Sequence, residues 1–218
     1  MRRIVLILVA IASTTLVSNG QEKGKNALEV TLNPAALFTG STGPLFVMPY
    51  LKARFFLQED IAFRMGLGID FNANTTHPFN SSENIEKNTA FGFSLSPGVE
   101  KHFGSGKFSP YIGTALTLSW KTSGGKYTVG NTRITTHNIW TDGTNPAYFG
   151  LGLEGLAGCD YYVTDNFYLG FEFSPGLSYT RNLEQERNNS GTSVTTPPSS
   201  YVSFSLYSSS GLKVGIRF

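Results

Sequence analysis

The sequence predicts an all-β fold: an eight-stranded antiparallel up-and-down transmembrane β-barrel with a polar, filled lumen. Three observations lead to this prediction. Apolar and polar residues alternate with period two through long stretches of the chain, which is typical of strands with two different faces. Charged residues and glycines gather on one of these faces. Short and long connections alternate between the stretches, as they do in membrane barrels.

The start of the chain has the features of a secretory signal peptide. A basic start precedes an uncharged apolar run over residues 4–12, and small residues follow it. The run is too short for a membrane-spanning helix, and this order of segments is the one that signal peptidase recognises. We predict cleavage after Gly20, so that residues 1–20 are the signal peptide and residues 21–218 are the barrel.

The composition excludes several classes of protein. The chain has 17 Lys and Arg against 15 Asp and Glu, and two of the basic residues lie in the signal peptide. The mature chain is therefore close to neutral, which argues against a nucleic-acid-binding surface. The single cysteine, Cys159, allows no intramolecular disulfide. After the signal peptide, no stretch is apolar over the ~18 residues that a membrane helix needs.

Eight alternating stretches are the expected strands. The first two are less regular than the rest. The last one is longer than the roughly 9–11 residues that a membrane strand needs. Pro97 and Pro175 interrupt the fourth and seventh strands, and we expect a bulge at each because proline cannot donate to the ladder. The stretches are residues 27–38, 45–57, 61–72, 89–103, 111–121, 148–163, 167–180 and 202–218.

The connections predict which end of the barrel faces which side of the membrane. Short turns are expected at residues 58–60, 104–109 and 164–166. An even number of strands places both ends of the chain beside these turns, which is the periplasmic side of an outer-membrane barrel. The longer connections lie at residues 39–44, 73–89, 122–147 and 181–200.

Two of the long connections have features of their own. Gly130-Asn131 lies between alternating residues, so it predicts a hairpin above the membrane. The polar segment 181–200 is typical of a mobile loop.

The placement of charge separates a membrane barrel from a soluble sandwich or a lipocalin-like barrel. In strands three to eight the apolar face carries one charge, Lys101, near a short turn. A soluble barrel would bury its many Phe, Leu and Ile in a lumen that has room for little more than side chains or one small ligand. Apolar side chains facing lipid, with charges and glycines inside, fit the pattern better.

The inward charges are the first candidate site. Six acidic and six basic residues fall on the inward face, and Glu29, Lys52 and Arg54 come from the two irregular strands. An ion-selective path would need an excess of one sign or an open bore. Balance and narrowness instead favour a packed network of paired charges. The residues that we assign to this lumen charge network are Arg64, Asp70, Glu100, Lys121, Glu154, Asp160, Glu172, Lys213 and Arg217.

With these stretches and the ending "LKVGIRF", the chain resembles the small eight-stranded outer-membrane barrels, such as OmpX and the membrane domain of OmpA. The resemblance implies export and location in the outer membrane. It also implies that the barrel assembly machinery reads a terminal signal, which on this chain maps to Leu212, Val214, Ile216 and Phe218. The group includes adhesins, scaffolds and enzymes, so the resemblance leaves the function open.

An enzymatic function is not expected. Some barrels of this size resemble lipid A-modifying hydrolases, which need His, Ser and an acid on the lipid-facing side. Here His77 and His137 fall in polar loops, and His102 points inward near a short turn, two residues from Glu100. A histidine among polar loop residues is usually solvated and not a catalytic base. No cofactor or metal site is predicted.

The expected function is therefore structural or accessory in an outer-membrane complex, or surface binding through the outer loops. Tyr127, Ile139 and Trp140 are the candidate loop contacts, and packing on a neighbouring loop is the alternative for Ile139 and Trp140. A small-solute channel is the alternative function. The expected partners are outer-membrane lipid, the assembly machinery and a protein of the same membrane.

Overall fold

The computed structural model describes residues 25–33, 51–80, 83–104, 106–206 and 208–218. In these ranges the chain forms thirteen strands in one antiparallel sheet and a short 3-10 turn, η1 (Pro78–Asn80), so the all-β antiparallel prediction is confirmed. No helix in the described ranges is long and apolar enough to cross a membrane. The strands are β1 (Asn26–Leu32), β2 (Leu51–Phe56), β3 (Ile61–Thr76), β4 (Ile85–His102), β5 (Phe108–Val129), β6 (Thr132–His137), β7 (Tyr148–Tyr162), β8 (Phe167–Phe173), β9 (Gly176–Asn182), β10 (Gln185–Asn189), β11 (Thr192–Thr196), β12 (Ser200–Ser205) and β13 (Gly211–Arg217).

Part of this sheet closes into a ring of eight strands. β5 pairs with β4 along one edge and with β7 along the other. From β4 the ladder continues through β3, β2 and β1 to β13, and β13 pairs with β8, which pairs with β7. Taken in chain order, each of the eight ring strands thus pairs with the next ring strand, and β13 closes the ring by pairing with β1. The members match the eight predicted stretches, with the seventh divided into β8 and β9 and the eighth into β12 and β13.

The two prolines do not act as predicted. Pro97 pairs with Met65, and the register on its other side is the same before and after it. The predicted bulge at Pro97 is therefore wrong, because the ladder skips this position without an inserted residue. Pro175 separates β8 from β9, yet both pair with β7 in one register. The irregularity lies in the facing strand: Ser205 pairs with Gly176 and Gly211 pairs with Glu172, so the facing strand advances six positions where this strand advances four.

The two faces of the ring have opposite polarity. Inward positions hold buried polar and charged side chains, while large apolar side chains point outward along β3, β4, β5 and β7. Leu153 is 56% exposed and Phe171 is 55% exposed. The buried hydrophobic cluster among the described residues is small and contains Ala27, Tyr162 and Tyr168. This inversion is the arrangement that the period-two alternation and the charge placement predict.

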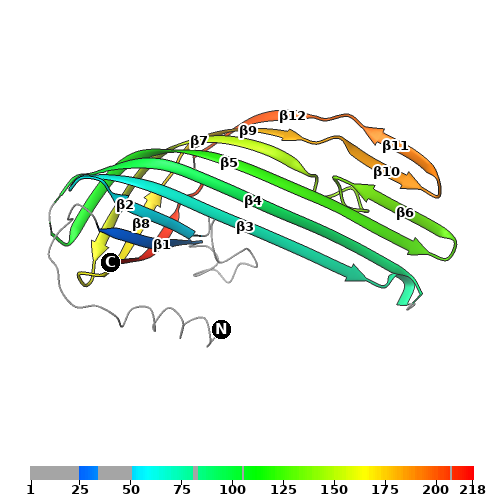
Figure 1. Ribbon diagram of the computed structural model, residues 1–218, viewed down its shortest axis with the longest axis horizontal. Helices are drawn as coiled ribbons and strands as arrows, with labels where there is room; N and C mark the ends of the chain where they lie inside the picture. Colours follow the sequence, from blue (N-terminus) through cyan, green and yellow to red (C-terminus); the bar gives the residue numbers. More distant parts are fainter. Residues whose placement is uncertain (1–24, 34–50, 81–82, 105, 207) are drawn as a thin grey trace.

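The two ends of the ring differ (Figure 1). The short turns lie at one end, where Asn26 and Phe218 exchange two backbone hydrogen bonds of 2.9 Å. At the other end β3, β4 and β5 run far beyond β1, β2 and β8. The predicted signal peptide and residues 34–50, which include the predicted loop 39–44, lie outside the described residues.

Two hairpins extend the sheet at this far end. β5 turns into β6 at Gly130-Asn131, as predicted, with Gly130 at a φ of 53°. β10 and β11 form a second hairpin, and β10 pairs with β6. The prediction of a mobile loop over residues 181–200 is therefore wrong. The segment is polar, yet part of it forms the strand β10, whose backbone pairs with the free edge of β6.

Glycines inside the ring make room for two tyrosine rings. Tyr111 is the cross-strand partner of Gly158, and Tyr168 is the partner of Gly215. A Cβ on Gly215 would lie 2.6 Å from Tyr168 Cε1, and a Cβ on Gly158 would collide with the Tyr111 ring in the same way. Glycine is therefore required at these two positions, because the rings of the two tyrosines lie against the facing backbone, where a side chain would otherwise be.

This packing predicts that Gly215→Ala lowers the free energy of unfolding by about 1–3 kcal/mol, because the Tyr168 ring must leave its place. Gly152→Ala is the matched control, since its Cβ would meet Thr117 Cβ at an ordinary 3.4 Å. The control should be neutral or stabilising by up to ~1 kcal/mol through loss of chain entropy in the unfolded state. Urea titration of the refolded protein checks both. Equal stability of the two variants would contradict the account.

Candidate functional site: a buried charge network

Eight charged side chains from seven strands meet inside the ring near its short-turn end. Each lies at an inward position of its strand and is at most 3% exposed. The set contains four bases and four acids, so its formal charge is zero. We call it the buried charge network; its members are Lys52, Arg54, Arg64, Lys213, Glu29, Glu100, Asp160 and Glu172.

Arg54 lies at the centre of the network. Its Nε is 2.8 Å from Glu100 Oε2, and its Nη1 is 3.3 Å from Glu29 Oε2. Nη1 also donates to Asp160. The guanidinium carbon lies 4.8 Å from the centre of the Tyr111 ring, which adds a cation–π contact. One cation from β2 thus joins acids from β1, β4 and β7.

Glu172 is the second centre. Lys52 Nζ and Arg64 Nη1 each donate to it at 2.8 Å, and the Tyr111 hydroxyl donates at 2.7 Å. Lys213 Nζ lies 2.8 Å from Asp160 Oδ1 and donates to Tyr111 Oη at 2.6 Å. All four carboxylates of the network have at least two cations within 4.0 Å. Such multiple pairing offsets the cost of burying the charges.

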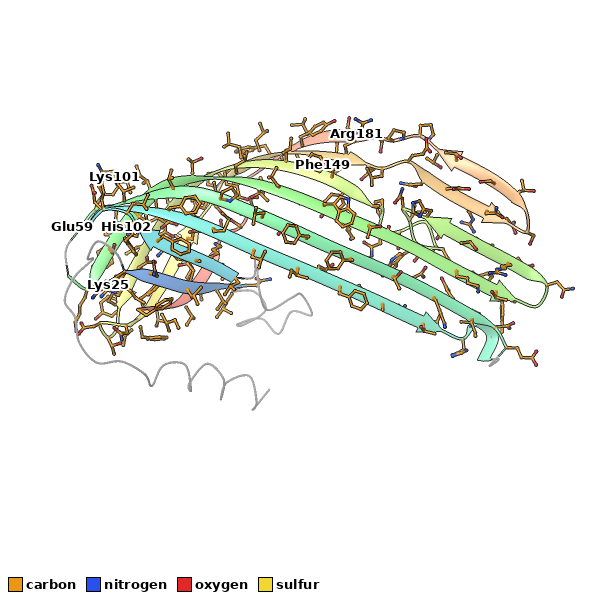
Figure 2. The ribbon with its side chains drawn as sticks, in the orientation of Figure 1. Lys25, Glu59, Lys101, His102, Phe149 and Arg181 are labelled. Atoms are coloured by element: carbon orange, nitrogen blue, oxygen red, sulfur yellow. The ribbon has the colours of Figure 1, made fainter. Side chains whose placement is uncertain are left out.

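A histidine and a serine continue the network towards the short turns. His102 Nε2 lies 3.2 Å from Glu100 Oε2, and His102 Nδ1 lies 2.9 Å from Ser109 Oγ. The order acid–His–Ser is that of a hydrolase triad. However, Ser109 is 1% exposed and His102 is 2% exposed, and Glu100 is already bound by two arginines. The group is packed inside the ring, beyond the reach of a substrate. Figure 2 shows His102 at the same end as Glu59 and Lys101.

Of the nine predicted network residues, five lie in the network and four lie elsewhere. Arg217 donates to the Asp165 carbonyl at 2.7 Å, nearer the short turns. Glu154 accepts from two serine hydroxyls on the far side of the network. Lys121 donates to the Asn145 side chain. Asp70 is half-buried and lies in the same cross-strand row as Lys121, since both stand opposite Gly92. The predicted members that meet are Arg64, Glu100, Asp160, Glu172 and Lys213.

Three members of the network were outside the predicted set, although they were counted among the inward charges. Glu29, Lys52 and Arg54 come from β1 and β2, the two stretches with irregular alternation. The signal that could have found them is the same period-two pattern, because their strand neighbours face outward.

The predicted loop contacts do not form one exposed surface. Trp140 donates from its indole nitrogen to the Thr89 carbonyl of β4 at 3.0 Å, and the next residue, Thr141, is buried against Asn88. Ile139 and Tyr127 are half-buried. Trp140 therefore packs on a strand, β4, where the alternative expected a neighbouring loop.

The terminal residues occupy the outward face of a fully paired strand. β13 pairs with β1 on one side and with β8 on the other. Leu212, Val214 and Ile216 are half-buried, and Phe218 is 59% exposed. No group of three or more His, Cys, Asp or Glu side chains in the described part of the chain could hold a metal ion.

Comparison with known proteins agrees with this architecture. The model of the Putative OmpA-OmpF-like porin family matches residues 45–218, which include every strand from β2 to β13. The search of curated proteins found no match. The matched range covers most of the chain, and the family is of the outer-membrane β-barrel type, as the apolar outer face and polar interior indicate. The chain belongs to the OmpA-OmpF-like porin family.

Proposed function

We propose that this protein is a non-enzymatic outer-membrane barrel with a closed interior, which acts as a structural or accessory subunit or as a surface-binding protein. The observation that carries the proposal is the buried charge network, which joins strands on all sides of the ring. A path through the ring would have to unpair these charges. The strands that extend beyond the ring, β3 to β6 with β10 and β11, offer the surface for interaction.

The membrane location is supported by the outer face of the ring. Apolar side chains of neighbouring strands form a continuous band, with Phe91 and Trp120 in edge-to-face contact at 6.3 Å between ring centres. Soluble proteins rarely expose apolar patches above a few hundred Å². In lipid, the same band satisfies the hydrophobic effect, and aromatic residues at its border suit the interface.

A charge placed in this band should prevent stable insertion. Leu67 pairs with Leu51 and Leu95 in the middle of the outer face of β3. Leu67→Arg should cost about 2–4 kcal/mol in a refolding titration into lipid. Ala73→Arg is the control: it has the same strand and the same face but lies beyond the band, where the cost falls to about 0–1 kcal/mol. Equal costs at the two positions would contradict a membrane-spanning ring.

The closed interior follows from size and from charge. Eight strands enclose a space that side chains almost fill. Here that space holds four arginine and lysine side chains, four carboxylates and the rings of Tyr111 and Tyr168. Removing one partner of a buried pair typically costs about 3–5 kcal/mol, so spontaneous opening is rare.

One observation favours the channel alternative. On the far side of the network, a cavity of about 110 Å³ is lined by small inward residues such as Thr117, Gly152 and Ser178, and by Glu154. Solutes could occupy this part of the interior, but a channel would also require the network to open. The family match, to porins by description, supports the same alternative.

Conductance separates the two functions. Wild-type protein in planar bilayers should give no steady current. Arg54→Ala should lower thermal stability and admit brief openings, because three carboxylates lose a partner. Arg181→Ala, which removes an exposed arginine from the outer face, should behave as wild type. A steady, ion-selective current from the wild type would refute the closed interior and establish the channel.

A subunit role has its own test. Native purification in mild detergent should recover a stoichiometric protein partner, whereas a protein that acts alone at the surface would purify without one.

A further inference from the structure

Three exposed cations lie close together on the outer face, at the far end of the sheet. Lys87 of β4 is the direct cross-strand partner of Lys126 of β5. Lys126 pairs with Thr135 of β6, so Arg133 lies on the diagonal from it. Direct partners have Cβ atoms about 4.5–5.5 Å apart, and diagonal neighbours about 7–8 Å. We call Lys87, Lys126 and Arg133 the outward basic patch.

The charges of this patch have no acidic partner in the described part of the chain. No carboxylate oxygen lies within 4.0 Å of the three side chains there. The acid on the neighbouring strand, Glu186, stands opposite His137 and accepts a hydrogen bond from Ser193. Two lysines in direct opposition destabilise a sheet. An anion from outside the chain that lay between them would relieve this repulsion.

The patch continues the apolar band of the outer face. Lys87 lies four residues beyond Phe91 on β4, and Lys126 lies six residues beyond Trp120 on β5. Even spacings keep them on the same face as the aromatic pair. At ~3.3 Å per residue, the lysines lie roughly 13–20 Å along the strands from these rings. If the band lies in lipid, as the proposed function requires, the patch is level with the headgroups of the outer leaflet.

A groove adjoins the patch on the same sheet extension. It has a volume of about 560 Å³, lies along β6 and β10, and is lined by Arg133, His137 and Asn188 and by one carboxylate, that of Glu186. Guanidinium, imidazole and amide groups of this kind donate hydrogen bonds to phosphate and sugar oxygens. The groove is therefore large enough and polar enough for a group attached to a bound phosphate.

We propose that the outward basic patch binds the phosphate groups of an anionic glycolipid in the outer leaflet, with the attached sugar in the groove along β6 and β10. The inference rests on the proposed membrane orientation. Lysine ammonium groups and an arginine fork are the side chains that recognise phosphate. Near the short turns, by contrast, the exposed Lys101 is paired with Asp60 at 3.4 Å.

The test is a lipid titration of the detergent-solubilised full chain, followed by native mass spectrometry. The probes are bis-phosphorylated lipid A, the same lipid without its phosphates, and inorganic phosphate. Removing all three cations with the Lys87→Gln, Lys126→Gln, Arg133→Gln triple variant should weaken lipid A binding about 100-fold. Lys107→Gln, which removes an exposed cation near a short turn, should bind as wild type.

Each arm has a result that overturns the inference. If the triple variant bound lipid A as tightly as the wild type, the outward basic patch would have no part in lipid recognition. Equal binding of the dephosphorylated lipid would show that the acyl chains carry the affinity. If inorganic phosphate alone saturated the outward basic patch, the ligand would be a soluble anion and not a glycolipid. A failure of the membrane orientation is distinguishable, because it would appear as silent Leu67→Arg and as no protection of the ring from protease in vesicles.

Discussion

The pairing of eight charges inside the ring is the constraint on which the rest of the structure depends. A carboxylate or guanidinium out of water is tolerated only when its partners are in place. Here the partners of Arg54 come from β1, β4 and β7, and those of Glu172 come from β2, β3 and β13. The network is complete only when the ring is closed. It therefore couples the last strand to the first through side chains as well as through the backbone.

This constraint explains why the molecule has two unlike ends. Near the short turns the interior is filled by the network, by Tyr111 and Tyr168, and by the glycines that accommodate their rings. Beyond it the inward residues become small, and the long strands leave the ring to form an extended sheet (Figure 1). The first part joins the strands of the ring through side chains and, in the proposed function, closes its interior. The second part presents hairpins and charged patches, which is where recognition can vary without disturbing the closed interior.

The sequence predicts well which face of its strand each side chain occupies, and it predicts poorly the position of that side chain along the axis of the ring. Alternation places Glu154 and Asp70 inside, and they are inside, yet neither joins the network. Strand period determines which way a side chain points, whereas its position along the axis depends on the stagger between strands, which no local pattern records. The β10–β11 hairpin was missed for a related reason: its residues are polar on both faces because both faces meet solvent. Pro97 was misjudged because a ladder can skip a proline without an inserted residue.

A double-mutant cycle on Lys52 and Glu172 tests the central claim most directly. Each of Lys52→Met and Glu172→Gln leaves a buried partner with reduced compensation, so each should lower the free energy of unfolding. If the two side chains share one closed network, the double variant should cost less than the two single variants added together. The expected coupling is about 1–3 kcal/mol. Additivity within about 0.5 kcal/mol would mean that the charges are solvated separately, and it would contradict a closed, paired interior.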